Sequence, residues 1–166
     1  YIVHRLDKET SGVLIVAKTR EYAQLFTSLF RIRKIHKTYI ALTYGKVSKD
    51  ITTLKDDLIT IDNGKKIYQN AISHIRLLKT STDYSYVELN PITGRKHQLR
   101  KQLYNIGNPI IGDDKYFINR RADKMKNKSK NLLLHAYKIK FMINNIQYNF
   151  KAEYDDEFEK FLKKNF

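Results

Sequence analysis

The sequence predicts an α+β fold in which helices flank a mixed, largely antiparallel central β-sheet. Short runs rich in β-branched and aromatic residues recur along the chain, which is typical of strands. Turn-forming residues join neighbouring runs, so adjacent strands should pair antiparallel. Stretches with apolar residues at helical spacing lie among these runs, and such helices bury their apolar side on the sheet. The 166 residues are enough for one ordinary domain.

The first quarter of the chain predicts two strands separated by a helix. Residues 13–17 form a short apolar run with β-branched members, which indicates a buried strand. Thr19 is a suitable N-cap for a helix over about 20–33, where aromatic and aliphatic residues keep helical spacing. Residues 37–44 alternate and are rich in Tyr, Ile and Leu, so we expect a strand that ends at Gly45.

The middle of the chain predicts an excursion followed by further strands. Residues 48–66 are polar and indicate a small hairpin around Asn63 and Gly64, a pair that favours tight turns. The other expected strands are at about 69–79, 84–90, 132–143 and 146–152, the last two being linked by Asn144 and Asn145.

A second helix is expected over 96–106. Leu99, Leu103 and Ile106 fall at i, i+4 and i+7, so one side of this helix packs inward. Gly107 is a typical helix stop. The remaining expected elements are a basic loop or solvated surface at 119–130 and a short amphipathic helix at 155–166.

The composition favours a polyanionic partner. Lys and Arg number 32 against 17 Asp and Glu, which leaves a net charge of +15. A biased genome would explain many lysines but not the shortage of acids, so nucleic acid is the favoured partner over an anionic membrane. The absence of Cys excludes a disulfide scaffold, a zinc knuckle and a thiol nucleophile. No apolar run approaches a membrane span, and we expect a soluble, intracellular protein.

The first motif is HRLDKETSG at residues 4–12. Asp7 lies between basic residues, whose positive charge favours its ionised form, and the Thr-Ser-Gly turn offers hydroxyl and N–H groups that would position it. Taken alone, the same residues favour a charged loop that carries a surface salt bridge.

The second motif is GRKHQLR at residues 94–100. On a helix, His97 and Arg100 share a side, whereas Lys96 and Arg100 form a like-charge pair that an anion would relieve. The N-terminus of a helix that starts after Gly94 would also attract phosphate. The alternative is a solvated basic helix surface.

The third motif is GNPIIGDDKY at residues 107–116. Its two adjacent acids have no convincing third ligand and lie in basic surroundings. His36 and His74 likewise have no partners at metal-binding spacing. We therefore predict no metal site.

Taken together, these motifs closely resemble those of the RluA-type pseudouridine synthases. The matching elements occur in the family's order and cover nearly the whole chain. They are HRLDKETSG at 4–12, KTYIA at 37–41, GRKHQLR at 94–100, the loop at 107–116 and LHA at 134–136.

The resemblance implies isomerisation of uridine in RNA to pseudouridine without a cofactor. Asp7 would be the essential carboxylate, acting either as a nucleophile or as a base that removes a ribose proton. Arg100 would pair with it. Tyr39 would stack on the target base and assist proton transfer, and Leu99 would pack beneath that base.

The resemblance also implies RNA-binding residues. Arg5 would enter the space that the flipped-out nucleotide vacates, or contact the RNA nearby; its alternative role is to screen Asp7. The residues expected to contact phosphates are Arg95, Lys96 and His97, together with the loop at 119–130.

We therefore predict a cytoplasmic, monomeric RNA pseudouridine synthase that binds neither a metal nor a membrane. Large-subunit (23S) ribosomal RNA is the favoured substrate and transfer RNA the alternative. A non-catalytic RNA-binding or ribosome-assembly module is the rival, although it would not need Asp7, Tyr39 and Arg100 together. We expect residues 1–166 to form the catalytic domain, with the family's first strands and any S4-like RNA-binding domain lying upstream.

Overall fold

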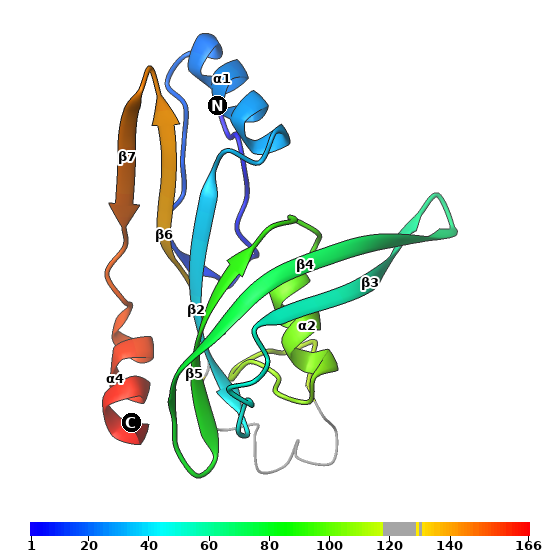
Figure 1. Ribbon diagram of the computed structural model, residues 1–166, viewed down its shortest axis with the longest axis vertical. Coiled ribbons are helices and arrows are strands. Elements are labelled where there is room, and N and C mark those ends of the chain that lie inside the picture. Colours follow the sequence, from blue (N-terminus) through cyan, green and yellow to red (C-terminus); the bar gives the residue numbers. More distant parts are fainter. Residues whose placement is uncertain (118–128, 130) are drawn as a thin grey trace.

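A single β-sheet organises the computed structural model, which describes residues 1–117, 129 and 131–166 (Figure 1). The described strands follow the order β1-β6-β2-β5-β4-β3, and β7, off this path, pairs with β6 from Lys138 to Ile143. Only the short β1–β6 pair is parallel, which confirms the α+β prediction of a mixed, largely antiparallel sheet. The strands are β1 (Ser11–Gly12), β2 (His36–Tyr44), β3 (Thr53–Asp62), β4 (Lys65–Thr80), β5 (Tyr84–Pro91), β6 (Leu134–Ile143) and β7 (Ile146–Lys151), and the helices are α1 (Arg20–Arg31), α2 (Gln98–Asn105) and α4 (Asp156–Asn165).

The capping and turn residues act as predicted. Thr19 caps α1 by accepting a hydrogen bond from the backbone of Tyr22. Asn144 and Asn145 both adopt positive φ, 50° and 61°, in the tight turn between β6 and β7. Gly107, at φ 80°, follows the end of α2. The basic loop expected at 119–130 lies outside the described residues except for position 129.

The hairpin at Asn63 and Gly64 is larger than predicted. Both residues have positive φ, as the turn requires, but the two strands pair continuously from Thr53 and His74 to the tip. Backbone hydrogen bonds hold these two strands together, and many of their side chains are polar. The hydrophobic pattern therefore did not predict the full length of the hairpin. The β3–β4 hairpin projects well beyond the rest of the sheet (Figure 1).

The prediction of a strand at 13–17 is wrong. The segment is extended but makes no continuous ladder, because successive backbone N–H groups bind different partners. Val13 donates to the carbonyl of Ala136 at 2.8 Å, whereas Ile15 donates to the imidazole of His4, also at 2.8 Å. The regular pairing is limited to the two residues of β1.

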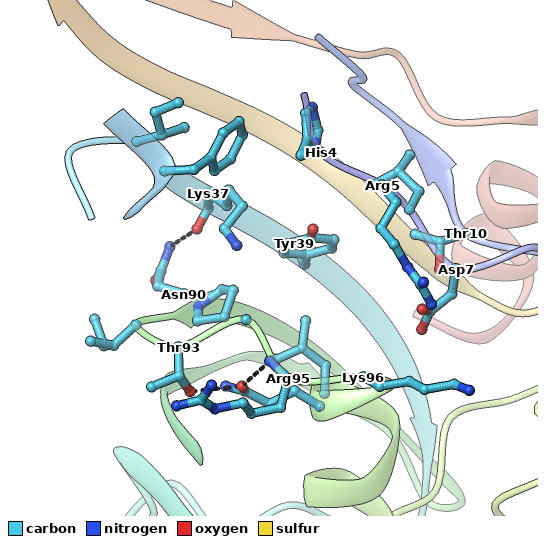
Figure 2. Close-up of a pocket in the computed structure, with 18 of the residues that line it drawn as sticks. His4, Arg5, Asp7, Thr10, Lys37, Tyr39, Asn90, Thr93, Arg95 and Lys96 are labelled. Carbon is cyan, nitrogen blue, oxygen red and sulfur yellow. Dashed lines mark hydrogen bonds between the residues drawn. The ribbon is translucent and has the colours of Figure 1, made fainter. Parts of the chain in front are cut away.

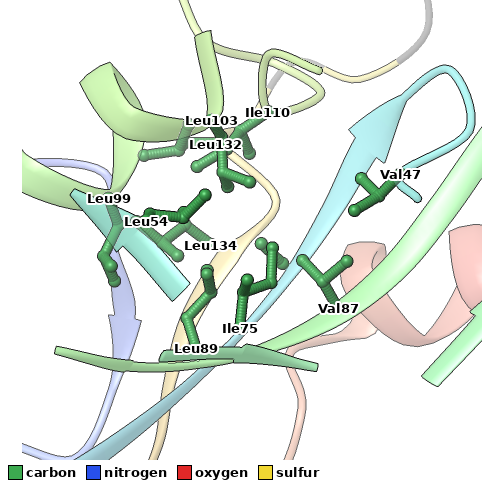
Figure 3. Packing of buried hydrophobic residues seen from close by; sticks show 11 residues of the cluster. Val47, Leu54, Ile75, Val87, Leu89, Leu99, Leu103, Ile110, Leu132 and Leu134 are labelled. Carbon is green, nitrogen blue, oxygen red and sulfur yellow. The ribbon is translucent and has the colours of Figure 1, made fainter. Parts of the chain in front are cut away.

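Alternation along β2 divides the molecule into two packed layers. Tyr39 and Ala41 face the side covered by α2, where Leu99 and Leu103 meet the apolar residues of β4 and β5 (Figure 3). Ile40 faces the opposite side, which α4 covers.

The helices α4 and α1 each cover an apolar part of the sheet with a buried phenylalanine. Phe158 of α4 is fully buried and packs against Tyr86 and Tyr154, with ring centroids 6.3 and 5.2 Å away. Phe26 of α1 meets Phe141 of β6 edge to face at 5.2 Å. Among the described helices, none is both long and apolar enough to cross a membrane.

The sheet divides beside its centre. Pairing between β2 and β5 ends at Tyr39 and Leu89; from there β2 continues beside β6, and β5 continues beside β4. Asn90 bridges the two strands where they separate, donating to the Thr38 hydroxyl at 2.9 Å and to the Lys37 carbonyl at 3.4 Å. The division leaves an opening in one side of the sheet, and a β-bulge in the β2–β6 pair lies at the same level.

We expect Phe158→Ala to lower the free energy of unfolding by about 3–5 kcal/mol, because it removes a fully buried aromatic ring from the α4 layer. Denaturant titration measures the change. Phe150→Ala is the control: this ring on β7 is 51% exposed, so the loss should be about 1 kcal/mol or less. Equal losses for the two variants would mean that α4 does not pack on the sheet as described.

Candidate active site

A cleft of about 1000 Å³ occupies the opening between β2 and β5 (Figure 2). Its walls are the loop at 3–10, the end of α1, the first half of β2 and the segment at 90–99. Seven of the eight residues that the sequence predicted for the site line this cleft; the exception is Arg100. The seven are Arg5, Asp7, Tyr39, Arg95, Lys96, His97 and Leu99.

Asp7 is the one acid among the described residues that line the cleft, and the basic lining residues far outnumber it. Its side chain is 18% exposed, so the carboxylate is sheltered but accessible from the cleft. A turn that closes from the Thr10 N–H to the Asp7 carbonyl at 3.0 Å holds its backbone. The buried hydroxyl of Thr10, which has no partner in the described structure, also lines the cleft.

The rest of the first motif anchors the loop that carries Asp7. The Ser11 hydroxyl donates to Asp155 Oδ2 at 2.8 Å and is hydrogen-bonded to His135 Nδ1, also at 2.8 Å. Gly12 has a φ of 113°, and a β-carbon there would overlap a backbone carbonyl of β6. The loop is therefore tied to β6 and to the N-cap of α4.

Tyr39 presents a neutral phenol to the cleft. Burial, together with the negative charge of Asp7, raises the pKa of Tyr39 to about 12. Beside it, Leu99 is almost fully buried in the core and contributes an apolar wall. An aromatic ring and an apolar wall next to a carboxylate suit a planar ligand with a polar edge.

His97 lies between Asp7 and the loop that follows α2. Its left-handed backbone, at φ 53°, precedes the first turn of α2, and its Nδ1 is hydrogen-bonded to the Tyr116 hydroxyl at 3.0 Å. Its Nε2 lies 3.9 Å from Asp7 Oδ1, beyond hydrogen-bond distance. Burial lowers the pKa of His97; Asp7 opposes this shift, whereas the nearby Arg100 and Lys115 add to it. The ring is therefore mainly neutral near pH 7.

The predicted direct pairing of Arg100 with Asp7 is wrong. The guanidinium donates two hydrogen bonds to Asp113, both at 2.7 Å, and one to Asp114 at 3.1 Å. Hydrogen bonding to Asp113 raises the pKa of Arg100, with Asp7 contributing only a weaker attraction. The loop after α2 brings these two acids to the guanidinium, so Arg100 supports the wall of the cleft from behind. The adjacent acids Asp113 and Asp114, for which the sequence analysis found no metal site, therefore serve as partners of Arg100.

The second helix begins two residues later than predicted, at Gln98. The buried Gln98 side chain accepts from the Thr93 hydroxyl at 2.7 Å and from the Arg95 N–H at 3.0 Å. Its amide donates to the Ser73 hydroxyl at 2.9 Å. α2 therefore begins at this polar network and not directly after Gly94.

The other basic residues lie around the rim. Arg5 and Lys96 are exposed, and their side chains extend along the Asp7 side of the cleft (Figure 2). Arg95 is held by a bond from its Nε to the Asn70 carbonyl at 3.2 Å. The sequence analysis missed Lys37, although its position two residues before Tyr39 on a strand places both side chains on the same side.

Comparison with known proteins gives a consistent result. The family model of RNA pseudouridylate synthase matches residues 1–105. Ribosomal large subunit pseudouridine synthase C of Rickettsia bellii is 40% identical over 151 residues, which cover 83% of this chain and 48% of that protein. tRNA pseudouridine synthase C of Haemophilus ducreyi is 33% identical over 159 residues, covering 84% of this chain and 65% of that protein. The chain thus spans about half the length of the Rickettsia relative.

A solved structure shares the fold. Human RNA Pseudouridylate Synthase Domain Containing 4 superposes with a TM-score of 0.73 at 28% identity, covering 98% of this chain and 74% of that chain. The arrangement of strands and helices is therefore that of known pseudouridylate synthase domains.

We expect Ser11→Ala to lower the free energy of unfolding by about 1–3 kcal/mol, because it leaves Asp155 and His135 without their shared partner. Thermal or denaturant unfolding measures the effect. Ser48→Ala, which removes an exposed hydroxyl, should change stability by no more than about 0.5 kcal/mol. A Ser11→Ala protein as stable as the Ser48→Ala control would show that this network does not anchor the loop.

We expect Asp113→Asn to lower the free energy of unfolding by about 3–5 kcal/mol, because it leaves the buried Arg100 guanidinium without its main counter-charge. Asp114→Asn is the matched control. Its carboxylate contacts the same guanidinium but its side chain is 75% exposed, so the loss should be about 0–1 kcal/mol. The assignment fails if the two variants unfold at the same denaturant concentration.

Proposed function

Because the chain belongs to the RNA pseudouridylate synthase family, we propose that it isomerises uridine in RNA to pseudouridine. The observation that carries this proposal is a single accessible carboxylate, Asp7, beside the neutral phenol of Tyr39 in a cleft otherwise rich in cations. The cations suit a polyanionic substrate, and the net charge of +15 acts in the same direction.

The reaction needs no external reactant, because every atom of uridine is retained. The bond between N1 and C1′ breaks, uracil turns in place, and a bond forms between C5 and C1′. The proton on C5 is lost and N1 gains one. A cleft suits this series of steps, since the detached uracil must stay beside the ribose until the new bond forms.

In our proposal, Asp7 performs the central step. It either attacks the nucleoside covalently or removes a ribose proton, and both routes use its ionised form. Tyr39 stacks on the uracil, and its hydroxyl, which remains protonated at neutral pH, assists proton transfer at C5. Leu99 supports the base from below. Arg100 acts at a distance, by fixing the wall that carries His97.

The target uridine must leave its stack before Asp7 reaches it, which costs a few kcal/mol. We propose that Arg5 occupies the vacated space or contacts the RNA beside it, since this exposed side chain lies at the mouth of the cleft. Arg95, Lys96 and His97 would contact the RNA from the segment before α2. Contacts of this kind position the RNA more than they specify its sequence.

Large-subunit ribosomal RNA is the proposed substrate, because the Rickettsia relative carries that substrate in its name. Transfer RNA is the second candidate on account of the Haemophilus relative. One chain supplies Asp7, Tyr39 and Leu99, so we propose a monomer that acts in the cytoplasm without a metal or a cofactor.

We expect Asp7→Asn to reduce pseudouridine formation by about 10⁴-fold or more, because the substitution removes the reacting group. The full-length protein is incubated with unmodified ribosomal and transfer RNA, and pseudouridines are mapped by carbodiimide-dependent stops of reverse transcription. RNA binding should stay within about threefold, because the carboxylate adds no attraction for phosphate.

Asp83→Asn, an exposed acid in the β4–β5 turn, is the control and should retain full activity. If pseudouridine formed in transfer RNA and not in ribosomal RNA, the proposed reaction would stand and the proposed substrate would be transfer RNA. Wild-type rates from the Asp7→Asn protein would overturn the proposed function.

A further inference from the structure

A second basic group lies deeper in the cleft than the motif residues described above. Lys37 is two positions before Tyr39 on β2, so both side chains face the cleft and lie roughly 7 Å apart along the strand. Its Nζ approaches the segment before α2, where a β-carbon on Gly94 would be 3.8 Å away. In Figure 2 the ammonium points into the cleft, on the side of Tyr39 away from Asp7.

The Lys37 ammonium has no acidic partner among the residues that the structure describes. Within the described part of the chain, no acceptor lies within hydrogen-bond distance of its Nζ, and Asp7 lies beyond ion-pair distance. Burial accordingly lowers the pKa of Lys37. The neighbouring His4 cannot supply a counter-charge, because an imidazole is either neutral or cationic. Burial, followed by the charge of Lys37, lowers the pKa of His4 to about 4, so it stays neutral. A sheltered cation without a partner is costly, and a bound anion would offset that cost.

The dimensions of the cleft leave room for such an anion. Its volume of about 1000 Å³ lies at the upper end of pockets that enclose a drug-sized ligand, roughly 300–1,000 Å³. One flipped-out uridine beside Asp7 and Tyr39 therefore leaves part of it empty. Besides Lys37, the lining of the cleft includes Phe30, Arg33 and Ile92, a combination of cationic and apolar groups.

We propose that Lys37 binds a backbone phosphate of the RNA next to the isomerised uridine, in a phosphate subsite separate from Asp7. This inference rests on the proposed function, because it takes RNA as the ligand. A phosphate is favoured over a base oxygen because it carries the full negative charge that the sheltered ammonium lacks. Asn90 fixes the subsite by holding the backbone of Lys37 where β2 and β5 separate.

The test compares Lys37→Met with Lys37→Arg in the full-length protein. Binding of a short oligouridylate is measured by fluorescence anisotropy across a range of salt concentrations, and KM and kcat are measured on an unmodified large-subunit ribosomal RNA transcript. For Lys37→Met we expect KM to rise about tenfold, kcat to stay within about twofold, and the salt dependence of binding to weaken by about 0.7 in slope, the value for one lost phosphate contact on a single strand. Lys37→Arg should restore most of the affinity.

Two further measurements separate this role from a structural one. Lys37→Met should unfold at no lower a denaturant concentration than the wild type, because it removes an unpaired cation. Lys160→Met, which removes an exposed lysine of α4 outside the cleft, should leave KM and the salt slope unchanged.

A lower kcat with unchanged KM and salt slope would place Lys37 on the reacting base and overturn the proposal. A loss of stability in Lys37→Met, or an unchanged KM and slope, would overturn it as well. The binding arm does not depend on catalysis. A wild-type protein that shows the Lys37-dependent salt slope but forms no pseudouridine would contradict the proposed function and leave the phosphate subsite in place.

Discussion

The separation of β2 from β5 is the constraint on which the site depends. Pairing between these strands ends at Tyr39 and Leu89; the residues before Tyr39 pair with β6, and those after Leu89 pair with β4. A continuous sheet would offer no room at this point, whereas a divided one creates a cleft without breaking the core beneath it. Tyr39 lies where the strands part: its backbone is paired with Leu89 of β5 and Ala136 of β6, and its side chain lines the cleft.

Rigid supports surround the reacting carboxylate, and most of them lie outside the cleft. Ser11 joins the loop of Asp7 to β6 and α4, while Gln98 fastens the segment before α2 to the sheet. Arg100 is buried in ion pairs with Asp113 behind the wall. Each support uses a polar side chain with satisfied partners, which fixes geometry more specifically than apolar contact alone. The contrast with Lys37 is informative, because that sheltered cation has no acidic partner among the residues that the structure describes.

Local signals in the sequence predicted the elements well where caps and turns decide them. Thr19 and the paired Asn144 and Asn145 set their helix start and turn through interactions within a few residues. The prediction failed where pairing is decided at a distance. Residues 13–17 have the composition of a strand, yet their N–H groups bind to separate partners; the β3–β4 hairpin has a polar composition, yet it pairs over its full length. Strand composition reflects burial, whereas strand pairing depends on which segments meet.

The sequence by itself determined the residue types of the site, because HRLDKETSG, KTYIA and GRKHQLR carry an acid, a phenol and cations at recognisable spacings. It also determined a basic protein suited to a polyanion, since net charge is a sum over residues. Only the tertiary structure decided which charges are paired. Arg100 was assigned to Asp7 by motif but is held by Asp113, and Lys37 was passed over although it lies in the cleft with no acidic partner among residues 1–117, 129 and 131–166. The reason is physical: an ion pair depends on separation in space to within a few ångströms, and groups as far apart in the chain as Asp7 and Arg100 are placed only when the whole sheet forms.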